Sequence, residues 1–600
     1  MQKALIFLAG SYFLIAALQS VGSQKMTMEV RPLNIPQLNF EERVDPQLLH
    51  QSEFVATAMN TLPGLQVKKY GGAGQLQTIS VRGLRANATL VMLDDILLNG
   101  QGDGSFDLGN LLSGSIQNVG FAVTPYHNIY HAPGGLIEMQ TRRSSDENLH
   151  QFKTEVGSYG TTYTHLQVGH RAPRYRYVLH GEGLYTLGIP QKSVLRKQGE
   201  KDKYKTGALA GAFDVDITPF VNLDVVGRAY DSTLCTDLGV VQPLADPQGE
   251  SYNQFRFLRA KLTYDQGTGI SHTFVSGMVK NKRTIKDSYR YVSDEKTLMG
   301  RYRLRYQPDR YTYLQTGISV MGQSFKAAVM RREIVSRGFV DGQGMVMPGL
   351  LIGGGVTCHH LAAFGGACTA AGKIQYEISP GWFAKSILRT SLRYPTLSSR
   401  FADSPQAVPN PELKPEKGHV WEVGLTYAGE EIGGELFYFL TDTRNLIWTK
   451  AVALGRYKRL NGSLRTQGIE ATFSFQRDSW KVYGSYTYTH SMSASSPLLD
   501  RAFPVHKVHL GGNYLGDQNW GITGSATLVG ARVSQDYNSY PPQPVKLKAY
   551  VLMEGEIYYV LGENRKVYLR VENALNQAYE DVAGYATPGR TFWMGVSVAF

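Results

Sequence analysis

The sequence predicts a transmembrane β-barrel of about 22 antiparallel strands that holds an N-terminal α+β plug domain in its lumen. Residues 144–600 alternate between apolar and polar side chains in long stretches separated by turn signals. The chain contains 64 Gly and 36 Tyr, which membrane barrels use in tight turns and interface girdles. After residue 23 no segment approaches the roughly 20 apolar residues of a spanning helix. A barrel explains the mean hydropathy of −0.24, because its lumen-facing residues are polar.

The strand number follows from the length of the alternating region. Its 457 residues (600 − 143), divided among 22 strands, allow about 21 residues for each strand and its connection. Strands of about 9–11 residues with short turns on one side and long loops on the other need that length. The clearest hairpins turn at residues 477–479 and 562–564, and the last alternating stretch ends at Phe600. Such a barrel has a lumen wide enough to need a plug.

The region before the barrel divides into three parts. Residues 1–23 are predicted to be a signal peptide, with Lys3 in the positive region and an apolar stretch behind it. Residues 24–40 become rich in Pro and Asn and are interpreted as a tether. Residues 41–143 mix a helical pattern with short strands and are predicted to form the plug.

Within the plug, one helix and two strands are expected. Ser52 is predicted to cap the N-terminus of a short helix that carries Val55 and Met59 on one buried face. Strands are predicted at residues 78–82 and 89–93, and a Gly-rich loop follows the second of them.

Composition also bears on the class of function. The net charge of +12 suggests an anionic partner, but no basic run or zinc-finger spacing indicates nucleic acid. The charge is therefore assigned to attraction to the anionic lipopolysaccharide of an outer membrane or to an anionic ligand. The chain has no nucleophile elbow, H-E-x-x-H zinc motif or P-loop. The sequence predicts a protein that is not an enzyme.

The three cysteines predict one local cross-link. Cys358 and Cys368 lie ten residues apart in a Gly-rich stretch, and an exported protein meets an oxidising compartment. We expect them to form a disulfide within an exposed extracellular loop. Cys235 is left over and is interpreted as a buried or lipid-facing thiol.

Motifs along nearly the whole chain after residue 23 resemble those of the TonB-dependent outer-membrane receptors. Residues 62–65 (LPGL) resemble the helix-ending LPGV of that family, and residues 79–83 (ISVRG) its IRG strand. Residues 90–95 (LVMLDD) resemble VLVLIDG, and residues 134–137 (GGLI) resemble GGVINI. In the barrel, residues 410–416 (NPELKPE) resemble NPNLKPE. The resemblance implies an active importer in the outer membrane of a Gram-negative bacterium.

Two departures from the family pattern lie in the plug. Asp94 and Asp95 stand where the family has Asp-Gly, which implies a different turn. Residues 123–125 (VTP) stand where the family has Arg-Gly-Pro. The missing Arg implies a different network of salt bridges between plug and barrel.

Within the family, the closest resemblance is to receptors for vitamin B12 (cobalamin). Residues 71–76 (GGAGQL) resemble the plug loop GGSGQL of those receptors, as do residues 536–541 and 584–590 in the barrel. Cobalamin or a related corrinoid is therefore the predicted transported ligand. A ferric siderophore or haem receptor is the first alternative, and a passive porin-like channel or adhesin is the second.

The resemblance implies that two plug loops, residues 71–75 and 100–107, face outward and contact the ligand. Glycine lets the backbone approach a bulky ligand closely, and neutral polar side chains suit an amide-decorated ligand better than a ferric catecholate. The predicted ligand-binding residues are Gly72, Gly74, Gln75, Gln101, Gly104, Ser105 and Phe106.

Release of a tightly held ligand needs energy from the inner membrane, so the resemblance also implies TonB as partner. An extended segment, Thr27, Met28, Glu29 and Val30, resembles the TonB box pattern T-x-x-V. Thr and Val favour strands, and such a segment can pair with the edge of a partner's sheet.

No metal or cofactor site is predicted. Haem receptors of the family have a His between the segments that correspond to residues 392–395 and 410–413, and this chain has none there. Cobalamin receptors often bind calcium through clustered aspartates, which makes calcium doubtful here because the comparable acids are widely spread. Those acids are Asp231, Asp237, Asp246 and Glu250.

Overall fold

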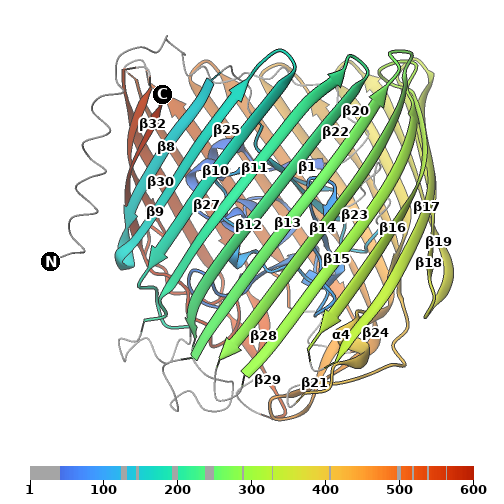
Figure 1. The fold of residues 1–600 in the computed structure, drawn as a ribbon. Coiled ribbons are helices and arrows are strands. Elements are labelled where there is room, and N and C mark those ends of the chain that lie inside the picture. Colours follow the sequence, from blue (N-terminus) through green and yellow to red (C-terminus); the bar gives the residue numbers. More distant parts are fainter. Residues whose placement is uncertain are drawn as a thin grey trace.

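The structure, a computed structural model, is a closed wall of tilted strands around the N-terminal elements (Figure 1). It describes residues 41–122, 131–143, 148–191, 201–236, 249–286, 290–327, 329–404, 407–495, 502–516, 519–536, 540–562 and 564–600. The predicted signal peptide and TonB box fall in residues 1–40, outside the described residues. Among the described residues, no helix has the length and apolar character needed to cross a membrane.

The barrel has 22 antiparallel strands, each paired with its neighbours, and β32 pairs with β8 to close it. The strands are β8 (Asn148–Gly157), β9 (Thr161–Arg171), β10 (Tyr175–Thr186), β11 (Tyr204–Thr218), β12 (Val221–Thr236), β13 (Gly249–Asp265), β14 (Ile270–Lys286), β15 (Arg290–Tyr306), β16 (Tyr313–Lys326), β17 (Met330–Met347), β18 (Leu350–Leu361), β19 (Gly365–Ser379), β20 (Trp382–Arg393), β22 (Glu416–Ala428), β23 (Ile432–Ala453), β24 (Arg456–Arg477), β25 (Trp480–Met492), β26 (His506–Leu515), β27 (Trp520–Val529), β30 (Tyr550–Leu561), β31 (Arg565–Glu572) and β32 (Thr591–Ala599). The predicted fold class is confirmed.

The two predicted hairpins are present. β24 and β25 are joined by Asp478 and Ser479, and Asp478 has a φ of 50°, which suits a two-residue turn. β30 and β31 turn between the paired residues Leu561 and Arg565. The period-2 alternation therefore located both strands and turns correctly.

Side chains alternate between membrane and lumen along each strand. On β16, Leu314 and Ile318 are 57% and 61% exposed, whereas Gln315 and Ser319 are buried toward the lumen. This alternation places apolar side chains against lipid and polar ones against the plug. It accounts for the low mean hydropathy of a protein that crosses a membrane.

The two ends of the barrel differ in their connections (Figure 1). At one end, here called the turn end, strands are joined by short turns such as residues 219–220 and 380–381, and the C-terminus lies there. At the other, the loop end, connections such as residues 394–415 and 530–549 are long. These loops carry α4 (Leu397–Phe401), β21 (Ala407–Val408), β28 (Arg532–Asp536) and β29 (Gln543–Leu547).

The plug lies inside the barrel and has its own small sheets. A five-stranded sheet has the order β1-β6-β7-β4-β5, and β2 pairs with β3 in a separate hairpin. The elements are β1 (Glu41–Arg43), α2 (Pro46–Gln51), α3 (Val55–Met59), β2 (Leu65–Lys69), β3 (Gln77–Val81), η1 (Ala86–Ala88), β4 (Leu90–Leu93), β5 (Ile96–Leu97), η2 (Leu108–Asn110), β6 (Ile116–Ala122) and β7 (Leu136–Thr141). Their apolar residues form one core that continues into inward-facing residues of the barrel wall.

The predicted cap of the plug helix is wrong. Ser52 does not begin α3; it ends the preceding helix α2, where its hydroxyl donates to the carbonyl of Leu48. Asp45 caps the N-terminus of α2, because its carboxylate accepts from the backbone nitrogen of Gln47. Phe54 precedes α3 without a side-chain cap, so burial of its apolar face, rather than capping, stabilises this short helix.

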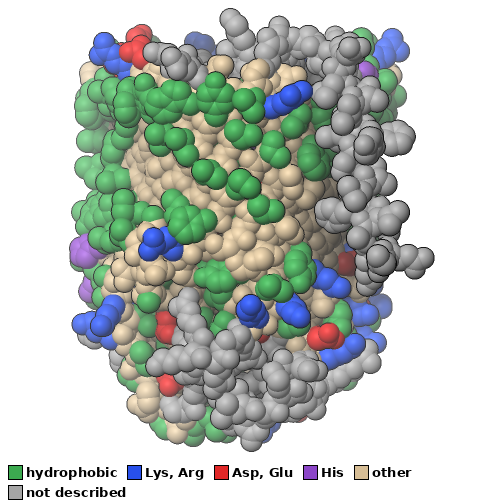
Figure 2. Space-filling model, turned by 90° about the vertical axis from the view of Figure 1, so that its left-hand side faces the viewer, with side chains coloured by type: hydrophobic (Ala, Val, Ile, Leu, Met, Phe, Trp, Pro, Cys, Tyr) green, Lys and Arg blue, Asp and Glu red, His purple; other side chains and the backbone are tan. Residues whose placement is uncertain are grey.

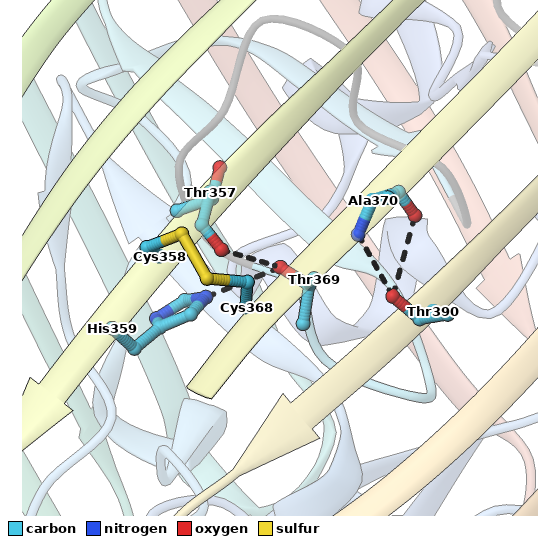
Figure 3. The surroundings of a disulfide bond; sticks show 7 residues. All are labelled: Thr357, Cys358, His359, Cys368, Thr369, Ala370 and Thr390. Carbon is cyan, nitrogen blue, oxygen red and sulfur yellow. Dashed lines mark hydrogen bonds between the residues drawn. A yellow bond between two sulfur atoms is a disulfide. The ribbon is translucent and has the colours of Figure 1, made fainter. Parts of the chain in front are cut away.

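Cys358 and Cys368 form a disulfide with an S–S distance of 2.06 Å. It is not within a loop, because the two residues are direct partners on adjacent strands β18 and β19. Both cysteines face outward, whereas Thr357, His359 and Thr369 beside them are buried toward the lumen (Figure 3). The Gly-rich stretch that suggested a loop instead continues the alternation of a short hairpin near the loop end.

Candidate ligand-binding site

The first predicted plug loop, residues 71–75, lies at the tip of the β2–β3 hairpin and packs against the barrel. Gly74 has a φ of 75°, and a Cβ there would lie 2.0 Å from the ring of Tyr204. Gln75 is buried, and its side-chain nitrogen donates to Asp202 over 3.3 Å. Gly72 faces Ile189 from the same loop-end connection. Glycine is needed here for contact with the barrel itself.

The second predicted loop, residues 100–107, lies under the connection between β20 and β22. Gln101 donates to the side chain of Gln323 over 2.8 Å and accepts from the backbone nitrogen of Leu397 over 2.9 Å. Gly104 has a φ of 85°, and a Cβ there would lie 3.0 Å from Thr396. The loop therefore makes polar contacts with the loop-end connection between β20 and β22.

Two further predicted residues in this loop differ in surroundings. Phe106 is buried, with its ring 6.0 Å from that of Phe255 in an edge-to-face arrangement. The Ser105 hydroxyl donates to the carboxylate of Asp103 over 2.8 Å. Of the seven predicted residues, only Ser105 lines a large cavity of about 560 Å³. Gln101 and Gly104 line a small one of about 90 Å³.

A cavity of about 560 Å³ lies between the plug and the loop-end connections. Its floor is the β2–β3 hairpin and the turn after β3, including Lys68, Tyr70 and Arg85. Its walls come from the extended ends of β23 and β24 and from three loop-end connections. The wall residues include Trp448, Tyr457, Arg459, Phe503, Arg532, Asp581 and Tyr585.

The cavity has a surplus of positive charge. Lys68, Arg85, Arg459 and Arg532 line it, against two acids. One acid, Asp581, is buried and pairs with Arg532 over 3.1 Å. The other, Asp103, accepts from Ser105. An anionic ligand would meet cations at the floor and wall.

The floor lysine is sensitive to this surplus. Lys68 is half-buried, and burial, together with the neighbouring charges of Arg85 and Arg532, lowers its pKa to about 8. The carboxylate of Asp581 acts in the opposite direction. A bound anion would favour the protonated form of Lys68.

Aromatic side chains share the cavity with these cations. The rings of Tyr70 and Tyr585 meet edge to face at 5.3 Å across the plug–loop boundary. The buried indole nitrogen of Trp448 has no hydrogen-bond acceptor among the described residues. Tyr457 and Phe503 add two more rings. Cations and ring faces in one cavity suit a ligand that is both anionic and aromatic.

Next to this cavity, the plug is fastened by a buried ion pair. Arg82 donates two hydrogen bonds to Glu470, over 2.9 and 2.8 Å, and another to Glu422. Its guanidinium also lies 4.4 Å from the ring centre of Phe439. Although burial alone would lower it, Glu470 and Glu422 hold the pKa of Arg82 above its usual value. The arginine of the sequence motif ISVRG therefore has a structural role.

Other contacts hold the N-terminal part of the plug. Lys507 of β26 donates to the backbone carbonyls of Asn60, Leu62 and Leu65 just after α3. Closer to the turn end, Asp45 pairs with Lys481. These contacts must break if this part of the plug leaves its place.

The unusual Asp94-Asp95 pair forms the turn between β4 and β5, with φ values of 45° and 75°. Asp95 accepts from Arg301 of the barrel over 2.5 Å, and Asp94 is buried against Thr141 and Arg143. The second acid therefore adds a plug–barrel ion pair. The other departure, residues 123–125, lies outside the described residues.

Among the described ranges, three or more His, Cys, Asp or Glu side chains do not gather in a group that could hold a metal ion. Of the acids considered for calcium, Asp231 pairs with Arg256, and Glu250 accepts from Tyr252. Asp237 and Asp246 lie outside the described part of the chain.

The fold and the cavity together define a plugged β-barrel with a partly open site toward the loop end. The family "TonB dependent receptor-like, beta-barrel" matches residues 93–574, and the family "TonB-dependent Receptor Plug Domain" matches residues 46–135. The chain belongs to the TonB-dependent receptors. It is therefore a transport protein of the Gram-negative outer membrane and not an enzyme, and the family implies ligand binding and energy coupling through TonB.

Solved structures of similar fold include siderophore receptors. The siderophore receptor PirA from Acinetobacter baumannii is 12% identical, with a TM-score of 0.81 over 94% of this chain and 98% of that one. A mutant of the ferric enterobactin receptor PfeA from Pseudomonas aeruginosa is 14% identical, with a TM-score of 0.79 over 94% and 98%. FpvA from P. aeruginosa, bound to a pyoverdine–iron complex, is 14% identical, with a TM-score of 0.76 over 97% and 88%. At these identities the likeness concerns the fold alone.

Proposed function

We propose that this receptor imports an anionic ferric chelate of the siderophore type. The observation that carries the proposal is the large cavity, whose lining combines Lys68, Arg85, Arg459 and Arg532 with several aromatic rings. A catecholate or related ferric complex carries negative charge and flat rings, which cations and aromatic faces bind together. The siderophore receptors of similar fold support this assignment as an analogy.

Cobalamin remains the second candidate, and it rests on the sequence motif at residues 71–76. The neutral groups expected to meet an amide-decorated ligand are engaged elsewhere in this structure. Gln75 donates to Asp202, and Gln101 donates to Gln323. A corrinoid would have to displace these contacts before it could use them.

The proposed handle for energy coupling is the segment Thr27 to Val30. Its support is the T-x-x-V pattern and its position ahead of the plug. Replacing Val30 with Pro should abolish import while surface binding of the ligand persists, because Pro removes a ladder donor from a pairing strand. Unchanged uptake by the Val30→Pro variant would place the box elsewhere.

A binding panel tests the ligand. The purified receptor is titrated with a ferric catecholate, a ferric hydroxamate, a ferric pyoverdine, haemin and cyanocobalamin, with quenching of intrinsic tryptophan fluorescence as readout. We expect the tightest binding for an anionic ferric complex, and weaker binding of the same complex at high salt. Tightest binding of cyanocobalamin would overturn the proposal in favour of the corrinoid.

A further inference from the structure

The two sides of the barrel lumen differ in charge. Strands β15 to β20 form one side of the barrel, and β30 to β32 with β8 to β10 form the other (Figure 1). On the second side, inward-facing basic and acidic side chains are mixed. Lys153 pairs with Glu155 over 3.3 Å, and Lys566 pairs with Glu556 over 2.7 Å. Each of these cations therefore has a carboxylate beside it.

On the first side, basic side chains predominate. Six of them face the lumen on β15 to β20 and are here called the lumenal cationic track. The track consists of Arg303, Arg305, Arg337, Lys373, Lys385 and Arg389. One inward-facing acid, Asp341 of β17, lies among them. A further basic side chain at this height, Arg301, pairs with Asp95 of the plug over 2.5 Å.

The strand register places the track on the lumen face of the wall. Arg305 is the direct partner of Gln315, which is 1% exposed. On β20, Arg389 is 1% exposed, whereas Leu388 beside it is 61% exposed on the outer face. Since side chains alternate across a strand, the six basic side chains share the lumen face.

The track runs from the loop end toward the turn end. Arg337 lines the small cavity at the loop end. Arg389 and then Lys385 follow along β20 toward the turn end, where that strand begins. Arg305 is the next-to-last residue of β15 at the turn end. Figure 2 shows the reverse pattern on one side of the outer wall, where hydrophobic side chains cover the middle and Lys and Arg lie mainly toward the rims.

The plug covers part of this track in the structure. Arg389 donates to the backbone carbonyls of Ala132 and Pro133 over 2.9 and 3.2 Å. Lys385 pairs with Glu435 of the neighbouring wall over 3.2 Å. Movement of this part of the plug would expose the track to water in the lumen.

The loop-end part of the track adjoins the large cavity across a single plug loop. Asp103 and Ser105 of that loop line the large cavity. Gln101 and Gly104 of the same loop line the small cavity, which Arg337 also lines. The loop therefore separates the two cavities, and a ligand that leaves the large cavity past it reaches the track.

We propose that the lumenal cationic track guides the anionic ligand from the large cavity to the turn end once the plug has moved. Basic side chains along one wall of a passage concentrate anions there. Several cations spaced along the route let the ligand exchange one partner for the next instead of staying at a single site. The inference rests on the proposed function, because only an anionic ligand would use such a track.

The first test measures whether the track makes the lumen select anions, and it needs no chelate. The full-length receptor is placed in a planar lipid bilayer, and urea on the turn-end side displaces the plug. The reversal potential is then measured in a potassium chloride gradient. We expect chloride to be preferred over potassium about fivefold. A variant with Arg303→Gln, Arg305→Gln and Lys373→Gln, here called the track variant, should lose most of this preference.

Two matched controls separate charge from structure. Arg303→Lys, Arg305→Lys and Lys373→Arg keep the charges of the track and should keep the preference for chloride. Lys282→Gln, Lys296→Gln and Lys326→Gln remove the same number of charges from the outer face of β14 to β16 and should also leave it unchanged. Heat-modifiable gel mobility verifies that each barrel is folded.

The second test measures transport by cells. The track variant should take up a ferric chelate about fivefold more slowly than the wild type. Its surface binding should stay within about twofold, because the track does not line the large cavity. An equal urea midpoint for plug unfolding verifies that the plug is seated as in the wild type.

Wild-type selectivity in the track variant, or an unchanged rate of uptake, would overturn the proposal and leave the proposed function standing. Failure of the wild type to bind any ferric chelate would contradict the proposed function and, with it, this use of the track, even where the lumen selects anions. The two failures are therefore distinguishable.

Discussion

Two arginines of a single plug turn, Arg82 and Arg85, occupy opposite environments. Arg82 is 2% exposed and is held by Glu422 and Glu470 from the barrel wall. Arg85, three residues later, lines the large cavity beside Lys68. Gly83 between them has a φ of 82°, which turns the chain from the barrel wall toward the cavity.

The two arginines of this turn therefore have different roles. Arg82 holds the plug to the barrel, and Arg85 faces the cavity. A charge whose hydrogen bonds are satisfied by two buried carboxylates fixes the plug and is not available to a ligand. A charge on the cavity surface attracts an anionic ligand and can exchange partners when it binds. Substitutions at the two positions should therefore change different measurements.

The largest effect is expected at the fastening site. Arg82→Met leaves Glu422 and Glu470 buried without their cation, which should destabilise the seated plug by about 3–5 kcal/mol. Urea unfolding followed by a fluorophore on the plug measures this. Adding Glu422→Gln and Glu470→Gln should restore most of the lost stability. An Arg82→Met plug as stable as the wild type would show that Arg82 does not hold the plug in the barrel.

Charge reversal in the cavity should act on binding alone. Arg85→Glu combined with Arg459→Glu should weaken binding of the ferric chelate about a hundredfold, because like charges then face the ligand. Arg456→Glu is the control, since Arg456 lies on the same strand but does not line the cavity. Fluorescence titration measures the affinity of the wild type, the double variant and the control. An equal loss of affinity in the double variant and the control would show that the effect does not come from the cavity.

A ring of the cavity wall should matter less than the cations. Trp448→Ala should lower affinity about tenfold, through loss of a ring face and of an indole donor for which the described residues supply no acceptor. Trp448→Phe keeps an aromatic ring and removes the donor, so its affinity should lie between those of the wild type and the Trp448→Ala variant. Competition with a radiolabelled chelate measures this without relying on the removed tryptophan's fluorescence.

Affinity should also depend on pH through Lys68. Burial and its cationic neighbours lower its pKa to about 8, so the side chain is charged below pH 8 and loses its charge above it. Affinity for an anionic chelate should therefore fall a few-fold between about pH 7 and pH 9. Lys68→Met should bind more weakly at pH 7 and lose most of this slope; an unchanged slope would assign the titration to another group.

The smallest effect on binding is expected at Gly104, on the packed side of the plug. Gly104→Ala strains a residue with a φ of 85° and crowds Thr396, so the loop should pack less well. Because Gly104 does not line the large cavity, affinity should stay within about twofold. A large loss in a folded barrel would show that the Gly-rich loop binds the ligand, as the sequence alone predicts.

Strand alternation made the barrel predictable. The turn at Asp478 and Ser479 lies between two stretches of period-2 alternation, and register between adjacent strands is a local property. The plug helices were harder. Asp45 and Pro46 mark the start of α2 with an N-cap and an N1 proline, but Ser52 offered a competing cap signal nearer the apolar residues.

The site could be predicted only in part. The Gly-rich loops do face the loop end, but their glycines serve contact with Tyr204 and Thr396 of the barrel and its loops. The cavity joins Lys68 to Arg459 and Tyr585, which are hundreds of residues apart in the sequence. No local pattern links such positions, because the closure of the barrel alone brings them together.

In the proposed binding mode, the ligand lies over the β2–β3 hairpin and Arg85, and not over the Gly-rich loop at residues 100–107. Crystals of the receptor soaked with the tightest ferric chelate of the panel would locate the iron by its anomalous scattering. We expect an iron peak in the large cavity, between Arg85 and Arg459. An iron peak above Gly104 instead would contradict this binding mode.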